Sequence, residues 1–104
     1  MILNNMQTIQ LTPEDRRLLG KVTGKEDVTV ICDSTNAAFA VDLYDASMAT
    51  GVNFYILNIG ANDVALNAPT GQFINDVWSV TLAQWDSCSL LPFEGRWYIL
   101  NRKT

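Results

Sequence analysis

From residue 27 to residue 101, apolar residues recur at every second position in short runs, and this alternation constrains the fold more than any other feature. In the stretch NAAFAVDL (36–43), Phe39, Val41 and Leu43 fall on one side of an extended chain. Ala40 and Asp42 fall on the other side. Side chains of a β-strand point alternately to its two faces, so this run predicts a strand with one buried face.

The same alternation predicts further strands, and turn formers separate them. The runs are DVTVIC (27–32), GVNFYILNI (51–59), DVALN (63–67), WSVTL (78–82), CSLL (88–91) and RWYILN (96–101). Short strands at this spacing predict an all-β domain, an antiparallel β-sandwich or a jelly-roll-like barrel. The alternation alone does not choose between these architectures or fix the strand order.

The chain divides into a predicted N-terminal arm with a short helix, residues 1–26, and a predicted β-domain, residues 27–104. In TPEDRRLLG, Thr12 can cap a helix, Pro13 suits its first turn and Gly20 can end it. The apolar residues up to residue 11 follow no clear period, so they fit either an arm lying on another protein or a cover for an edge of their own domain. They are Ile2, Leu3, Met6, Ile9 and Leu11.

The composition predicts a packed globular protein, because hydrophobic residues make up 48% of the chain and charged residues 17%. Its apolar runs are far shorter than the ~20 residues that a membrane-spanning helix needs. The start, MILNNMQTIQ, has neither a basic region nor a continuous apolar region, which argues against a cleaved secretory signal. We therefore expect that the protein is made in a cytoplasm and does not associate with a membrane.

Basic residues lie only near the two ends of the chain, and none occurs between Glu26 and Glu94. Seven aspartates fall in that interval: Asp27, Asp33, Asp42, Asp45, Asp63, Asp76 and Asp86. The middle of the protein therefore presents an anionic surface, which would repel nucleic acid.

Enzymatic chemistry is disfavoured by the absence of histidine, which removes the usual nucleophile pairs and the usual acid–base group near neutral pH. Asp42 and Asp45 are a carboxylate pair of the kind a glycosidase uses, but both lie next to a turn, where aspartate is common for backbone reasons. Calcium binding remains an alternative function, although the acidic residues do not have the spacing of an EF-hand. Its oxygen ligands would be Asp33, Asn36, Asp42, Asp45, Asn62 and Asp63. We expect a protein that is not an enzyme and has no cofactor.

Cys32 and Cys88 are far apart in the sequence, and no histidine is present to complete a metal site with them. In a reducing compartment the pair is interpreted as buried free thiols, with a disulfide as the alternative.

The stretch NIGANDVALNAPTG (58–71) is rich in asparagine and glycine and is interpreted as two turns around a strand. No GK[ST] follows it, which excludes a phosphate-binding P-loop, and no helix is predicted to begin there, which excludes a dinucleotide fingerprint.

The stretch belongs to a longer pattern, G-x-x-x-x-I-x-N-x-G-x-N-x-V-x-L, followed by a turn, a strand and a closing G-x-W-x-I. This order resembles small β-modules of tailed-bacteriophage virion proteins, which occur in head fibres, head-decoration proteins and tail fibres or spikes. The resemblance covers residues 27–101. It is carried by Leu43, Gly51, Ile56, Asn58, Gly60, Asn62, Val64, Leu66, Gly71, Gly95, Trp97 and Ile99.

The resemblance implies a capsid decoration (cement) protein that binds the outer surface of a phage head as a homotrimer. The implied partners are the major capsid protein and other copies of this chain, and the implied location is the capsid exterior after synthesis in the host cytoplasm. The N-terminal segment is the predicted shell contact, through apolar area and basic side chains. Its residues are Ile2, Leu3, Met6, Ile9, Leu11, Arg16, Arg17 and Lys21.

The aromatic residues support an alternative function, a phage fibre or spike module that binds host-surface carbohydrate. Trp78 and Trp97 lie in predicted strands and are predicted to be core residues. Trp85 lies between two strands, so Trp85 and Tyr55 are the candidate ligand-binding residues.

Overall fold

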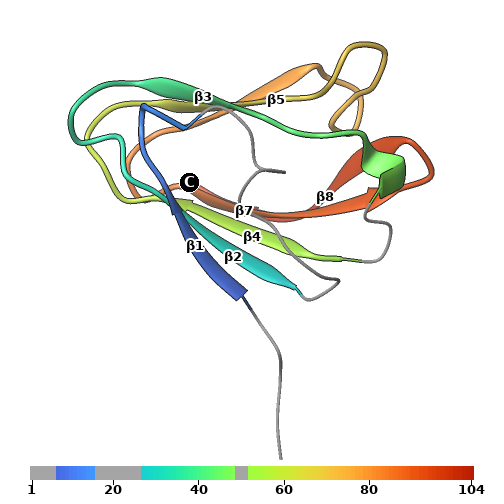
Figure 1. Cartoon of the computed structure of the whole chain (residues 1–104), viewed down its shortest axis with the longest axis horizontal. Helices are drawn as coiled ribbons and strands as arrows, with labels where there is room; N and C mark the ends of the chain where they lie inside the picture. The colour runs from blue at the N-terminus through green and yellow to red at the C-terminus, as the bar shows by residue number, and fades with distance from the viewer. Residues whose placement is uncertain (1–6, 16–26, 49–51) are drawn as a thin grey trace, which may run out of the picture.

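The computed structural model describes residues 7–15, 27–48 and 52–104 (Figure 1). Apart from one 3-10 turn, η2 (Ala46–Met48), every regular element in these residues is a strand. The strands are β1 (Gln7–Leu11), β2 (Val28–Cys32), β3 (Phe39–Asp42), β4 (Phe54–Asn58), β5 (Val64–Asn67), β6 (Ser79–Leu82), β7 (Ser87–Phe93) and β8 (Arg96–Lys103). The predicted all-β fold is therefore confirmed.

The strands form two sheets, which lie face to face in Figure 1 with the core between them. The larger sheet has the order β1-β2-β4-β7-β8 and the smaller sheet the order β3-β5-β6. Burial alternates along most strands, as in β2 and β4, whose even-numbered residues face the core and whose odd-numbered residues face outward. The architecture is a β-sandwich of two mixed sheets.

The prediction of an antiparallel sandwich was wrong for three strand pairs. β1 pairs with β2, β2 with β4 and β3 with β5 in parallel registers, while β4–β7, β5–β6 and β7–β8 are antiparallel. For β2–β4 and β3–β5 the cause is the path of the chain, which passes from β2 to β3 in the other sheet, returns as β4 and then passes to β5 beside β3. Each return through the opposite sheet brings the chain back in the same direction, so the strand takes the place of the usual crossover helix.

The N-terminal segment contains a strand that the alternation did not indicate. β1 pairs with β2 from Gln7 to Leu11 and forms one edge of the larger sheet, and Leu11 is buried in the core. For residues 7–11 the second interpretation of the segment applies, because they cover an edge of their own domain. Thr12 to Asp15 then form a turn in which the Thr12 N–H donates to the Asp15 carboxylate, and the rest of the predicted helix lies outside the described residues.

One end of the core holds an aromatic cluster of Tyr44, Phe54 and Trp97, packed edge to face at centroid distances of 5.4–6.0 Å. The Trp97 indole N–H donates to the Tyr44 carbonyl oxygen at 3.0 Å, so this fully buried ring has its polar atom satisfied. The prediction that Trp97 is a core residue is confirmed. The same prediction for Trp78 was wrong, because Trp78 precedes β6 and is 55% exposed.

Candidate functional site

The asparagine and glycine motif after β4 forms a buried polar corner that joins three loops of the sandwich. The Asn58 side chain is fully buried and accepts hydrogen bonds from the Ser34 hydroxyl and the Gly60 N–H. Its amide donates to the carbonyl oxygens of Asn62 at 2.8 Å and Leu82 at 2.9 Å. Two acceptor and two donor positions are all that an asparagine side chain offers, and Asn58 uses every one.

Asn62 and Gly60 complete the corner from the next loop. The Asn62 amide donates to the Ser34 carbonyl oxygen at 2.7 Å, and the Ser34 hydroxyl contacts the Asn62 carbonyl oxygen. Gly60 lies so close to Ser34 and Thr35 that an added Cβ would be 2.4 Å from their backbone nitrogens. The other motif residues, Ile56, Val64 and Leu66, are core residues. The motif is therefore structural, and its hydrogen bonds join the loops at one end of the sandwich.

Two of the four aspartates that were candidates for metal binding or catalysis, Asp33 and Asp45, are engaged in hydrogen bonds within the protein. Asp33 accepts hydrogen bonds from the Thr35 hydroxyl and N–H, which lower the pKa of the Asp33 carboxyl. Asp45 accepts from the Ser47 N–H, the Gln72 amide and the Ser47 hydroxyl, which lower the pKa of the Asp45 carboxyl. Within the described residues no three acidic, cysteine or histidine side chains cluster as metal ligands would.

The two cysteines are buried free thiols. Burial raises the pKa of the Cys32 thiol to about 12, with a further contribution from Cys88. Burial likewise raises the pKa of Cys88 to about 11, against the opposing charge of Arg102. A thiol needs its thiolate form to act as a nucleophile, so neither cysteine is a reactive group near neutral pH.

These thiols predict that the fold loses stability in alkaline solution. Their folded pKa values lie above the unfolded value of about 8.5, so their contribution is present below that pH and is lost as the pH rises toward 11–12. Urea denaturation should show a free energy of unfolding that falls by up to about 1.4 kcal/mol per pH unit for each thiol.

The control for alkaline loss is the double variant Cys32→Ala, Cys88→Ala. Its free energy of unfolding should stay level up to about pH 10, where tyrosine begins to titrate in an unfolded chain. Burial raises the pKa of Tyr44 to about 12, so the remaining loss of stability should begin near pH 10 and continue toward pH 12. An equal slope in the two proteins between pH 8.5 and 10 would contradict the assignment to the thiols.

The predicted shell-contact residues fall into two groups. Ile9 packs against the core and Leu11 is 1% exposed, so these two side chains belong to the sandwich. Leu11 cannot offer apolar area to a capsid, which corrects its place in the predicted contact. The remaining residues lie outside the described residues: Ile2, Leu3, Met6, Arg16, Arg17 and Lys21.

Trp85 is displayed on a strained turn between β6 and β7. Its side chain is 64% exposed and its φ is 69°, a left-handed conformation that bulky residues seldom adopt. The turn is fixed by the Asp86 N–H, which donates to the Ala83 carbonyl oxygen. The Trp85 N–H donates to the Asn58 carbonyl oxygen at 2.7 Å, so the polar corner also positions this turn. Strain retained at an exposed aromatic residue favours a functional role.

Replacing Trp85 by glycine is expected to raise the free energy of unfolding by about 0.5–1 kcal/mol. Glycine adopts a positive φ without steric cost, and the gain is partly offset by the greater freedom of glycine in the unfolded chain. Urea denaturation would measure the change. Trp85→Ala is the matched control, because alanine keeps the Cβ that causes the strain and should give no gain. Equal stabilisation by both substitutions would show that the tryptophan side chain, not its backbone, is unfavourable.

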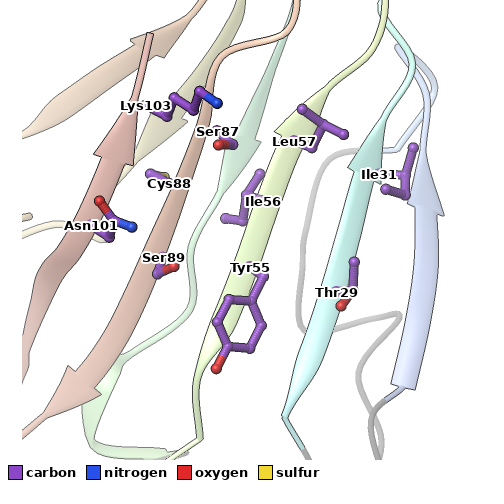
Figure 2. A pocket seen from close by; sticks show the side chains of 10 residues that line it. All are labelled: Thr29, Ile31, Tyr55, Ile56, Leu57, Ser87, Cys88, Ser89, Asn101 and Lys103. Carbon is purple, nitrogen blue, oxygen red and sulfur yellow. The ribbon is translucent and has the colours of Figure 1, made fainter.

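Tyr55 lies on the outer face of the larger sheet and borders a shallow groove of about 190 Å³ (Figure 2). Ser87 and Ser89 of β7 are small and lie between Tyr55 and Leu57 of β4 on one side and Asn101 and Lys103 of β8 on the other. Trp85 does not line this groove. The structure therefore places the two candidate ligand-binding residues on separate features, one on a sheet face and one on a turn.

The face that carries this groove also exposes several large apolar side chains. Tyr55, Tyr98 and Phe93 are 36%, 38% and 45% exposed. Half-buried aliphatic residues occur on the same strands, among them Leu57 and Leu91. Tyr98 and Phe93 were not among the predicted site residues, although the alternation that buries Trp97 also turns Tyr98 outward. We call the outer surface of β4, β7 and β8 the apolar face.

No protein-family model matches this chain, and no curated protein or solved structure is detectably similar to it. Separately, no helix in the described ranges is long and apolar enough to span a membrane.

Proposed function

We propose that this chain is a structural protein of a tailed-bacteriophage virion, a decoration protein that binds the outside of the head as a homotrimer. The observation that carries the proposal is the apolar face on an otherwise rigid sandwich. The outer face of a sheet is normally polar when water covers it, and a contiguous apolar patch marks an interaction site. We assign this face to self-association and the N-terminal segment to the major capsid protein.

The rigid corner and the inert side chains support a structural role. The buried thiols have raised pKa values, Asp33 accepts from Thr35 in its own loop, and Asp45 accepts from Ser47 and from Gln72. A decoration protein needs a stable body and adhesive surfaces, and association in threes multiplies a weak shell contact by avidity. The acidic middle of the chain would limit clumping of particles that carry many copies.

Light scattering of the purified chain tests the self-association. We expect three times the chain mass for the unaltered protein and a monomer for the double variant Tyr55→Glu, Tyr98→Glu, whose charges lie on the apolar face. Thr81→Glu, at an exposed position on the other sheet, is the matched control and should remain trimeric. A monomeric unaltered protein would contradict the homotrimer.

Electron microscopy of phage lysates from the source organism tests the location. Antibodies against the chain should label the outside of phage heads. Removing residues 1–6 should abolish that label. The shortened protein should still form a trimer in solution, because this deletion stops before β1. A longer deletion would remove an edge strand and expose the core, so it would not isolate the shell contact. Unlabelled heads would contradict decoration.

A second function, adhesion to the host surface, is supported by the exposed Trp85 on its strained turn. This function predicts carbohydrate binding that survives removal of residues 1–6 and fails in Trp85→Ala. Binding of labelled protein to host cells would measure it, and unchanged binding by Trp85→Ala would exclude Trp85 as the anchor.

A further inference from the structure

A second hollow lies at one end of the smaller sheet, where three strands begin or end together. β3 ends at Asp42 and β5 at Asn67, in the same direction, and β6 begins at Ser79. The hollow has a volume of about 350 Å³, within the range of roughly 300–1,000 Å³ that is typical of small-ligand sites. It is lined by Asp42, Leu43, Ala68, Pro69, Thr70 and Trp78.

Three polar side chains stand in a row beside the hollow. Asp42, Asn67 and Ser79 are direct neighbours across the three strands, on the outer face of the sheet. The Ser79 hydroxyl donates to the Asn67 amide oxygen at 2.7 Å, which fixes the amide and leaves its Nδ2 without a partner among the described residues. The Asp42 carboxylate is exposed and accepts no hydrogen bond within the same part of the chain. The row therefore offers an acceptor and a donor side by side.

Trp78 adds an aromatic surface to these polar groups. It is 55% exposed, it lines the hollow, and its carbonyl oxygen accepts from the Ala68 N–H at 2.9 Å, which ties it to the end of β5. An indole ring packs against apolar surface through its face. A carboxylate can accept a hydrogen bond from one hydroxyl group, while the neighbouring amide N–H donates to another. A sugar ring presents both an apolar C–H face and adjacent hydroxyls.

We propose that the hollow lined by Asp42, Thr70 and Trp78, together with Asn67, the cross-strand neighbour of Asp42, binds a neutral pyranose unit of a glycan. Trp78 stacks on the apolar face of the sugar, while Asp42 accepts hydrogen bonds from its hydroxyls and Asn67 donates to one. Thr70 lies at the exposed rim of the hollow. An organic cation would also suit an aromatic ring beside a carboxylate, but it would leave the Asn67 donor unused.

Trp85 differs from this hollow, because the polar side chains next to Trp85 already form hydrogen bonds within the protein. The Asp86 carboxylate next to Trp85 already accepts from the Ala83 N–H at 2.9 Å, so it is committed to the turn. Gln84 donates to the Ile59 carbonyl oxygen, so the other polar neighbour is also engaged. The proposed sugar site does not depend on a virion role, since it uses the sheet opposite the apolar face.

The three tryptophans provide the test within one spectrum of the full chain. Proton–nitrogen correlation spectra would be recorded during titration with the methyl glycosides of glucose, galactose, mannose and N-acetylglucosamine, and with choline. We expect at least one glycoside to shift the indole signal of Trp78 and the side-chain amide of Asn67 with millimolar affinity. The indole signals of Trp85 and buried Trp97 should stay in place.

Variants confirm or refute the assignment. Trp78→Ala and Asp42→Ala should each weaken glycoside binding at least tenfold, and the unshifted Trp97 indole signal would show that the core is intact. Asp63→Ala is the matched control, an exposed aspartate before the opposite end of β5, and should bind as the unaltered protein does. The proposal is overturned if no glycoside moves the Trp78 signal, if only choline does, or if the Trp85 signal moves instead.

Discussion

Replacing Gly60 by alanine is expected to lower the free energy of unfolding by more than about 4 kcal/mol, a large part of the roughly 5–15 kcal/mol that stabilises an ordinary domain. An added Cβ would lie 2.4 Å from the backbone nitrogens of Ser34 and Thr35 and 2.5 Å from the Ser34 carbonyl carbon. Backbone atoms cannot rotate away as the end of a flexible side chain can. The whole Ser34 loop would have to move, and Asn58 and Asn62 would lose their partners there. Urea denaturation followed by Trp97 fluorescence would measure the loss.

Gly71→Ala is the matched control for this prediction. Gly71 has a φ of +84°, but a Cβ there would meet nothing within 4 Å. Its substitution should therefore cost about 1 kcal/mol of backbone strain and no more. Similar losses at Gly60 and Gly71 would show that backbone conformation, not the close approach of two loops, explains the requirement for glycine in the motif.

The alternating pattern predicted most of the fold because it records directly which side of each strand is buried. The runs at 27–32, 51–59 and 63–67 contain β2, β4 and β5, and the residues that they placed on one face are core residues. Along these strands burial is local information, since every second side chain must be apolar to cover the core. The turns were predicted from residue type, because asparagine, glycine and proline occur where the chain must reverse.

The direction of strand pairing and the first strand were not predictable from the same pattern. Buried and exposed side chains alternate in the same way in parallel and antiparallel sheets. The parallel direction of the pairs β2–β4 and β3–β5 therefore leaves no local signal in the sequence. β1 is an edge strand with exposed Thr8 and Gln10, and its two apolar residues Ile9 and Leu11 do not stand out as a period from the irregularly spaced apolar residues before them.

The site residues were the hardest to assign, because exposure depends on neighbours that are distant in the sequence. Trp78 precedes a strand that buries Val80 and Leu82, and its residue type alone favours the core. It is exposed because it lies at the open end of the smaller sheet, beyond the last pair of β5 and β6. Asn67 joins Asp42 only through the parallel register of β3 and β5, which the sequence does not reveal.

Replacing Asn58 by aspartate is expected to cost at least about 4 kcal/mol at neutral pH, although the two side chains have nearly the same shape. The introduced carboxylate keeps an acceptor for Ser34 and Gly60, but it cannot donate to the carbonyl oxygens of Asn62 and Leu82. Each lost bond to a buried carbonyl costs about 1–3 kcal/mol, and the buried charge faces two carbonyl oxygens. Asn67→Asp is the matched control, because the Asn67 Oδ1 accepts from Ser79 and its Nδ2 donates to no described residue. That variant should change the free energy of unfolding by less than about 1 kcal/mol.

The pH dependence of the Asn58→Asp variant separates a buried charge from a simple loss of packing. Burial would raise the folded pKa of the introduced carboxyl above its unfolded value of about 3.9, so the neutral form is favoured in the folded protein. The variant should therefore gain stability relative to the unaltered protein as the pH falls from 7 toward 4, and lose it as the pH rises. The unaltered protein should change little over this range and lose stability only below about pH 4, because hydrogen bonds lower the pKa values of Asp33 and Asp45, whose contribution is present above the unfolded pKa of about 3.9 and lost as the pH falls through the folded values. A variant that loses the same free energy at pH 4 and pH 7 would mean that the four-bond geometry of Asn58, and not its lack of charge, is what the corner requires.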